Sequence, residues 1–272
     1  MLDPLIVDVY PHDFGGAPDI GKLVAAGYPW CGLILKATEG TYYPANQKLE
    51  VREWFAKHWL PTRILPLERY GAKPGALKMG KLEIGERIVP FYRGAYHYFR
   101  ADQDPIKQAE LFLLEVQKAG GWGPGDLWPM VDVESAENPP GISAAQLADG
   151  VGRFASKVTQ ELGRSCMLYG NVYVWERGVK THMNCGLLTT ARYEETLPPA
   201  TYQRIGWELP IPPAIPTLWG WQYNGGTPGK LKGYPTTCPM DPNEHCDITA
   251  VVVGGGADPW ASLDWTTENL SR

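Results

Sequence analysis

Short hydrophobic segments recur along the chain, and several of them end in charged residues. Bounded by glycine, proline and polar residues, they predict β-strands at Leu5–Tyr10, Gly32–Gly40, Arg93–Phe99, Trp128–Ser135, Cys166–Asn171, Leu187–Tyr193, Leu218–Tyr223 and Asp247–Val253. Between the early strands, helices are predicted at Pro18–Gly27, Ala45–Trp59, Pro105–Gly120 and Ser143–Gly163. Residues 60–92 are rich in Pro, Gly, Lys and Arg, and we interpret them as an insertion or a long excursion before the third strand.

The order of these elements indicates the fold class. Strands alternate with helices in the first half of the chain, and eight strands in total predict a single α/β domain, a closed (β/α) barrel of the TIM type. The later strands follow one another closely, so some crossover helices there are expected to be short or missing. We expect the barrel to span residues 1–257, with its end marked by Gly254–Gly256, and residues 258–272 to form a short polar tail.

The segment Trp128–Ser135 carries two carboxylates near the end of a predicted core strand. Side chains alternate across a strand, so Asp132 and Glu134 share one face, with their Cα atoms about 6.5 Å apart. In barrels of this type the chemistry lies where the strands end. Two adjacent carboxyl groups cannot both ionise cheaply, and their pKa values tend to separate into a proton donor and an anion, as a glycosidase requires. A capping or ion-paired acid pair is the structural alternative.

Other polar positions in the strands also have two interpretations. Asp8 lies inside the first strand, where an acid is costly unless it is paired or emerges at a rim. We favour the rim. Lys36 and Glu39 are interpreted as a structural ion pair inside the barrel. His97 is interpreted as a hydrogen-bonded core histidine rather than a base or ligand.

Composition narrows the classes of partner. A net charge of −5, without a polybasic face, disfavours nucleic acid. The 11 Trp and 14 Tyr outnumber the 6 Phe, and amphipathic aromatic residues suit carbohydrate stacking. Trp219 and Trp221 are predicted to share one strand face, so one or both are candidates to face a groove. No run of about 18 apolar residues predicts a membrane span. The histidines show no metal-ligand spacing, so neither metal nor cofactor is expected.

The chain has five cysteines, an odd number without a zinc-binding spacing. Cys238 and Cys246 flank a short loop and could form a disulfide. Cys31, Cys166 and Cys185 fit buried free thiols at least as well. A core strand begins almost directly after Met1, which leaves no room for a signal peptide.

Eight short motifs follow one another at the strand ends. They are Asp8-Val9, Leu35–Gly40 (Leu-Lys-Ala-Thr-Glu-Gly), Gly94–His97 (Gly-Ala-Tyr-His), Val131–Glu134 (Val-Asp-Val-Glu), Leu168-Tyr169, Ala191–Tyr193, Trp221–Tyr223 (Trp-Gln-Tyr) and Cys246–Ile248. Each motif is weak alone. Together, and in this order along nearly the whole chain, they resemble the family 25 glycoside hydrolases, the N-acetylmuramidase lysozymes of microbes and their phages.

The resemblance implies a barrel of five β/α units followed by three strands. It also implies cleavage of the β-1,4 bond between N-acetylmuramic acid and N-acetylglucosamine in peptidoglycan, by a monomer without a cofactor. Glu134 would be the general acid, and Asp132 would stabilise positive charge or orient the 2-acetamido group of the substrate. The remaining implied site residues are Asp8 and Asp247 in the acidic cluster, and Tyr96, Tyr169, Trp221 and Glu39 as substrate contacts.

Several points stay open. Water could attack directly with inversion, or the acetamido oxygen of the substrate could attack with retention. Asp247 could instead lie in a loop. The sequence departs from the family pattern at Tyr10–Phe14 and in the length of the 60–92 excursion, which bears on the shape of the groove.

Two competing functions are a catalytically silent wall-binding or phage tail-associated module, and a metal-dependent polysaccharide deacetylase. The intact acids argue against the first, and the absence of a His/Asp ligand spacing argues against the second. Without a signal peptide, a phage-encoded lysin, released by a holin or carried by the virion, is favoured over a secreted bacterial enzyme.

Overall fold

The computed structural model describes most of the barrel and its helices. It covers residues 4–10, 18–41, 47–59, 64–65, 75–78, 81–84, 87–123, 126–134, 141–170, 174, 178–179, 181, 183–191, 217–225, 230–240 and 246–251. The predicted domain end at Gly254–Gly256 and the predicted tail at 258–272 lie outside the described residues, as does the Pro11–Phe14 part of the departure from the family pattern.

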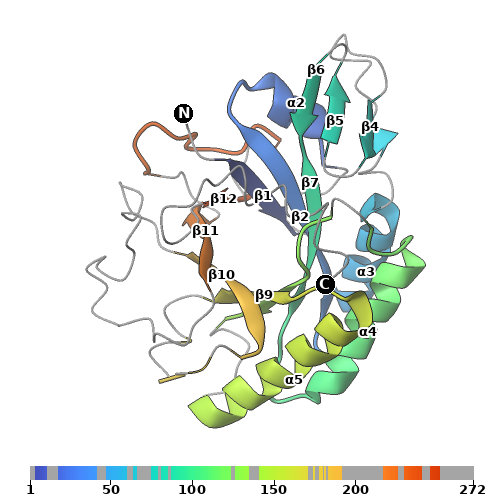
Figure 1. The fold of residues 1–272 in the computed structure, drawn as a ribbon, viewed down its shortest axis with the longest axis vertical. Helices are drawn as coiled ribbons and strands as arrows, with labels where there is room; N and C mark the ends of the chain where they lie inside the picture. Colours follow the sequence, from blue (N-terminus) through green and yellow to red (C-terminus); the bar gives the residue numbers. More distant parts are fainter. Residues whose placement is uncertain are drawn as a thin grey trace.

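Eight strands close into a barrel in the order β1-β12-β11-β10-β9-β8-β7-β2, which confirms the predicted fold class (Figure 1). Each strand coincides with one of the predicted segments to within a few residues. The strands are β1 (Leu5–Val9), β2 (Trp30–Glu39), β7 (Tyr92–Tyr98), β8 (Met130–Val133), β9 (Cys166–Gly170), β10 (Cys185–Ala191), β11 (Thr217–Asn224) and β12 (Asp247–Val251).

One strand runs against the others. β12 pairs antiparallel with both of its neighbours, β1 and β11, whereas the remaining neighbours in the barrel pair in parallel. The amino-terminal end of β12 therefore lies at the rim where the other strands have their carboxyl-terminal ends. This reversal brings Asp247, the first residue of β12, opposite Asp8 on β1.

The alternation of side chains divides the core into two layers. Ile6, Ile34, Met130 and Met167 belong to the cluster that fills the inside of the barrel. Residues that alternate with these along the strands, such as Val131 next to Met130, belong to the larger cluster between the barrel and its helices. In β8, Val131 and Val133 thus face the helices, whereas Met130 faces the inside of the barrel.

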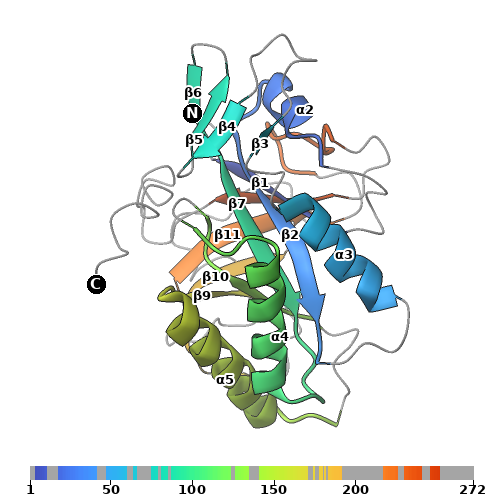
Figure 2. The same ribbon diagram turned by 90° about the vertical axis from the view of Figure 1, so that its right-hand side faces the viewer.

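Helices cover one side of the barrel (Figure 2). They are α2 (Ile20–Ala25), α3 (Gln47–Trp59), α4 (Pro105–Lys118) and α5 (Ala144–Leu162). Local sequence sets the ends of α5, because Ser143 forms a capping box with Gln146 and Gly163 ends the helix in the left-handed region at φ 65°. Between β10 and β12 the described residues form no helix, in line with the crowding predicted there. In the described part of the chain, no helix has the length and apolarity needed to cross a membrane.

Residues 60–92 contribute a small antiparallel sheet of four strands in the order β3-β4-β5-β6. Its strands are β3 (Ile64–Leu65), β4 (Gly75–Lys78), β5 (Lys81–Ile84) and β6 (Arg87–Pro90). β6 runs through Phe91 into the amino-terminal end of β7, and this part of the sheet projects from one end of the barrel (Figure 1). That end is opposite the rim that carries the acids of β8.

A buried ion pair ties three segments together at the amino-terminal end of β7. The Arg93 side chain is fully buried, with Nε 2.7 Å from Oδ1 and Nη2 3.0 Å from Oδ2 of Asp126. Its guanidinium also lies 3.6 Å from the ring centroid of Trp59 and donates to the Trp59 carbonyl oxygen. This two-pronged pairing joins the end of α3, the start of β7 and the loop before β8.

His97 is a core residue, as interpreted from the sequence. Its ring is fully buried and stacks on Phe154 of α5, with centroids 4.8 Å apart. Nε2 lies 3.0 Å from Gln108 Oε1, which can only accept, so Nε2 carries the proton and Nδ1 accepts from the Thr38 hydroxyl at 2.8 Å.

The cysteines are all buried. Cys31, Cys166 and Cys185 are free thiols, in agreement with the sequence interpretation. Cys238 and Cys246 both lie in the larger hydrophobic cluster, and their pairing stays a prediction.

We expect Asp126→Asn to destabilise the fold by about 3–5 kcal/mol, because it leaves the Arg93 charge buried without its counter-ion. Urea unfolding at pH 7 measures this. The control is Lys157→Met, which removes a solvent-facing helical pair with Glu161 and should leave the unfolding midpoint nearly unchanged. Equal effects of the two substitutions would contradict the anchoring role of Arg93.

Candidate active site

The two acids of β8 reach the carboxyl-terminal rim of the barrel. In the strand register, Asp132 lies between Tyr98 of β7 and Tyr169 of β9. Only 7% of Asp132 is exposed, whereas Glu134, just past the end of the strand, is half-buried. Glu134 is therefore the member of the pair that is open to a ligand, and Asp132 lies deeper.

Asp8 and Asp247 reach the same rim from β1 and β12, where they are direct cross-strand partners. Two buried tyrosines show that all four acids converge. Burial raises the pKa of Tyr96 well above its usual value, and Asp8, Asp132, Asp247 and Glu134 each raise it further. Burial and the same four charges also raise the pKa of Tyr169. Both phenols therefore stay protonated and able to donate hydrogen bonds at neutral pH.

Burial is also the main influence on the two acids of β8. It raises the pKa of Asp132 well above the ordinary value, the charge of Glu134 raises it further, and Lys36 opposes them. Burial likewise raises the pKa of Glu134, again opposed by Lys36. Oδ1 of Asp132 is buried and accepts no hydrogen bond from any residue that the structure describes. Two such groups titrate as a pair, so their second proton is lost only well above the usual range for carboxylic acids.

A hydrogen-bonded chain crosses the mouth of the barrel. The Tyr169 hydroxyl donates to Gln222 Oε1, and Gln222 Nε2 donates to Asp8 Oδ2 at 3.4 Å. The chain links β9, β11 and β1 and orients the Asp8 carboxylate. Gln222 was not among the predicted site residues, although it stands in the Trp-Gln-Tyr motif. The sequence did not indicate that Gln222 faces the mouth of the barrel, because the alternation of side chains in β11 is interrupted.

The register slip in β11 also corrects a prediction about its tryptophans. Leu188 pairs with Leu218 but Thr189 pairs with Gly220, so Trp219 is an extra residue. Trp219 consequently points into the barrel, whereas Trp221 belongs to the outer cluster and is 1% exposed. The prediction that they share one face is wrong. A ring buried to this extent cannot stack on a sugar, so Trp221 is not retained as a substrate contact.

A similar slip in β2 brings Lys36 and Glu39 together. Lys36 pairs with Tyr96 and Thr38 with His97, which leaves Ala37 as the extra residue of a bulge. Lys36 Nζ lies 3.1 Å from Glu39 Oε2, and Arg100 Nη1 lies 3.6 Å from Glu39 Oε1. The predicted ion pair inside the barrel is confirmed. Both carboxylate oxygens of Glu39 face cations, so its contacts in the structure are with Lys36 and Arg100. Direct binding of Glu39 to a sugar stays a prediction.

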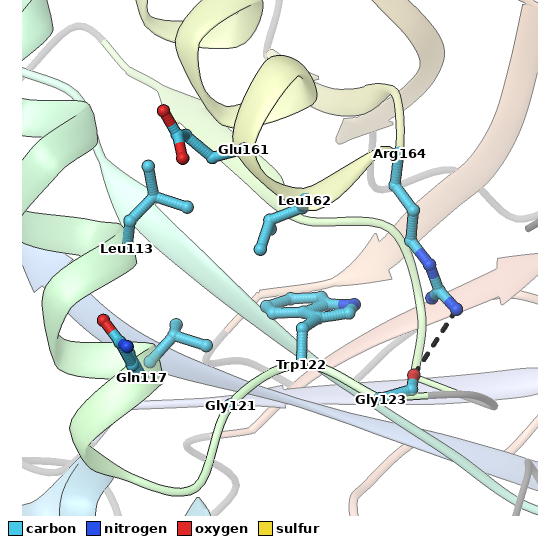
Figure 3. Close-up of a pocket in the computed structure, with 9 residues that line it drawn as sticks. Leu113, Gln117, Gly121, Trp122, Gly123, Glu161, Leu162 and Arg164 are labelled. Atoms are coloured by element: carbon cyan, nitrogen blue, oxygen red, sulfur yellow. Dashed lines mark hydrogen bonds between the residues drawn. The ribbon is translucent and has the colours of Figure 1, made fainter.

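A cavity of about 430 Å³ lies elsewhere, between the carboxyl-terminal ends of α4 and α5 (Figure 3). Trp122 forms its floor, and Arg164 at one side donates to the Gly123 carbonyl oxygen at 3.4 Å. Its one carboxylate, Glu161, is exposed and paired with Lys157. The cavity therefore lacks the paired acids of the rim. Among the described residues, no group of three or more His, Cys, Asp or Glu side chains is arranged to hold a metal ion.

A comparison with models of known protein families shows which family this chain belongs to. Residues 87–229, more than half of the chain, match the model of the glycosyl hydrolases family 25. The chain belongs to glycosyl hydrolase family 25. It is therefore a glycosidase, and the resemblance drawn from the strand-end motifs is confirmed. The matched region includes the Asp132–Glu134 pair, Tyr96, Tyr169 and Gln222. No curated protein sequence matches this family 25 chain.

Solved structures support the family fold over nearly the whole chain. A bacterial lysozyme from Streptomyces coelicolor has a TM-score of 0.60 at 16% identity, covering 99% of each chain. A muramidase from Trichobolus zukalii has a TM-score of 0.58 at 20% identity, covering 97% of this chain and 100% of its own. The catalytic domain of an endolysin from a bacteriophage of Listeria monocytogenes has a TM-score of 0.53 at 17% identity, covering 97% and 98%. At these identities the likeness concerns the fold.

The raised pKa of Asp132 predicts a gain in stability when its charge is removed. A carboxyl whose pKa is higher in the folded than in the unfolded state stabilises the fold below the unfolded pKa, near 4, and loses that contribution as pH rises towards the folded pKa. We therefore expect Asp132→Asn to be more stable than the wild type at pH 7, by on the order of 1 kcal/mol or more. The difference should fade towards pH 3.5, as measured by urea unfolding.

The control for this prediction is Asp149→Asn on the exposed surface of α5. It should leave the free energy of unfolding nearly unchanged at both pH values. A gain in Asp132→Asn that is equal at pH 7 and pH 3.5 would point to packing rather than charge as its cause.

Proposed function

We propose that this family 25 enzyme is an N-acetylmuramidase that cleaves the β-1,4 bond between N-acetylmuramic acid and N-acetylglucosamine in peptidoglycan. The observation that carries the proposal is the convergence of Asp8, Asp132, Glu134 and Asp247 at one rim of the barrel, with Glu134 just past the end of the strand that carries Asp132. The structural neighbours include proteins described as muramidase, lysozyme and endolysin, which supports the substrate class.

Glu134 is the general acid in this proposal. Cleavage of a glycosidic bond requires a proton for the leaving oxygen and stabilisation of an oxocarbenium-like centre. Burial raises the pKa of Glu134, which favours retention of the proton for general acid catalysis, and its partial exposure at the rim lets it reach the bond. Asp132 lies deeper, and in this proposal it orients the acetamido group or, when ionised, stabilises the positive centre.

The remaining residues hold the substrate and the anions. The protonated phenol of Tyr96 is a hydrogen-bond donor for the acetamido group in this proposal. The Tyr169 hydroxyl donates its proton to Gln222, so its oxygen is an acceptor for the acetamido N–H, and Gln222 orients Asp8 across the mouth. Two routes use this arrangement. In one, water attacks with inversion, activated by Asp8 or Asp247. In the other, the acetamido oxygen attacks with retention while Asp132 orients the acetamido group. The anomer first released from a defined muropeptide oligomer, observed by NMR, distinguishes them.

The proposed setting is the bacterial cell wall, reached as a phage-encoded lysin or as a secreted enzyme. We propose that the chain acts as a monomer on single glycan strands and that residues 1–257 form the catalytic unit.

We expect Glu134→Gln to lower the rate of clearing of a peptidoglycan suspension by about 10²–10⁴-fold, because the leaving oxygen is no longer protonated. Binding to sedimented walls should persist. The matched control is Glu161→Gln on the exposed face of α5, which should clear the suspension at the wild-type rate. A wild-type protein that binds walls without clearing them would refute the enzyme activity and favour the silent wall-binding module.

Mass spectrometry of the released fragments tests the bond that is cut. We expect new reducing ends at N-acetylmuramic acid after digestion of purified peptidoglycan, detected by borohydride reduction before analysis. Reducing ends at N-acetylglucosamine would instead identify a glucosaminidase and overturn the proposed bond specificity.

A further inference from the structure

Lys36 places a buried positive charge at the mouth of the barrel. Its side chain is 8% exposed, and Nζ is held by Glu39 Oε2 at 3.1 Å. The ammonium also lies 4.4 Å from the ring centroid of Tyr10 and 4.6 Å from that of Tyr98. An ammonium flanked by two aromatic rings and one carboxylate is held in one position without being fully neutralised.

The strand register places this charge beside Asp132. Tyr98, whose ring contacts the ammonium, is the direct cross-strand partner of Asp132. Asp132 Oδ1 accepts no hydrogen bond from the described residues, so hydrogen bonds do not stabilise a charge on this oxygen. A nearby cation stabilises an anion on this carboxyl group.

We propose that Lys36 is a positioning residue, which keeps the Asp132–Glu134 pair in the form that carries one proton. Its fixed ammonium allows one of the two buried carboxyl groups to ionise while the other retains the proton used for general acid catalysis. This inference rests on the proposed function, and it assigns Lys36 an electrostatic role beyond its structural pairing with Glu39.

The charges around Lys36 set the direction of each expected effect. Lys36 acts against burial in both members of the pair, while Glu39 faces the ammonium and weakens its field. Arg100 in turn pairs with the other oxygen of Glu39. Among the residues that the structure describes, the titratable and charged groups around the ammonium and the pair are Glu39, Tyr98, Arg100, Tyr10, Asp8, Asp132, Glu134, Tyr96, Tyr169 and Asp247.

The test compares the pH dependence of kcat/KM on peptidoglycan in two variants. In Lys36→Met the loss of the cation should move both limbs of the profile to higher pH by about one unit or more. At a fixed pH on the acid limb, kcat/KM should therefore fall roughly tenfold. In Glu39→Gln the loss of the opposing anion should move both limbs to lower pH. A merely structural ion pair would instead make the two variants lose activity alike, without moving either limb, and that result would overturn the proposal.

Two further variants provide controls. Lys36→Arg retains the charge and should keep the limbs near their wild-type positions. Lys118→Met removes another lysine that pairs with a glutamate three residues away, Glu115 at 3.0 Å, but on α4 and away from the rim. It should leave the profile unchanged. If Lys36→Met does not fold, the other two variants test the role of Lys36. Both limbs should then move to lower pH in Glu39→Gln and keep their wild-type positions in Lys36→Arg.

A measurement that does not depend on enzymatic activity separates this inference from the proposed function. Carboxyl ¹³C NMR titration of the wild type and Lys36→Met reports the two ionisations of the Asp132–Glu134 pair directly. A wild type that is inactive on peptidoglycan while its pair titrates about one unit lower than in Lys36→Met would overturn the proposed substrate and retain the role of Lys36. Unchanged titration in Lys36→Met would overturn the role of Lys36, whatever the substrate.

Discussion

The structure depends on the cost of burying like charges together. Asp132 lies almost fully inside the mouth of the barrel, next to Glu134 and within reach of Asp8 and Asp247. In water each of these groups would ionise independently, but burial and the neighbouring carboxylates penalise every additional negative charge at this site. The same penalty that works against folding raises the pKa of Asp132 and Glu134 and so favours retention of a proton at the rim. The catalytic proposal and the expected gain in stability on neutralising Asp132 are two consequences of this one cost.

Two other buried polar side chains of the barrel, Arg93 and His97, are satisfied by their neighbours. Arg93 and Asp126 are buried as deeply as Asp132, but they neutralise each other through two short contacts and are also fixed by Trp59. His97 is satisfied at both ring nitrogens by Thr38 and Gln108. These contacts join the barrel to α3 and α4, because Arg93 donates to the Trp59 carbonyl oxygen and His97 pairs with Gln108. Stability gained between the barrel and the helices thus offsets the destabilising arrangement at the mouth.

Three irregularities in the strands build the site. The reversal of β12 sets Asp247 opposite Asp8, although Asp247 begins its strand rather than ending it. The bulge at Ala37 turns Glu39 to the same side as Lys36, and the slip at Trp219 directs Gln222 into the mouth and Trp221 out of it. Regular alternation in β2 and β11 would have separated Lys36 from Glu39 and turned Gln222 away from the mouth, since the period of a strand is two residues. The reversal of β12 acts differently, because it changes the end of the barrel at which Asp247 lies.

The sequence by itself determined the strands, the larger helices, the class of barrel and the side of β8 that carries the acids, because hydrophobic periodicity and capping are local properties. It also identified the family, through short motifs whose order survives even though each is weak. It did not determine the strands of the 60–92 sheet, the partner of Arg93, the role of Gln222 or the outward position of Trp221. Only the tertiary structure decided these, because cross-strand register and bulges are set by contacts between residues far apart in the chain, and a shift of one residue reverses the face that a side chain occupies.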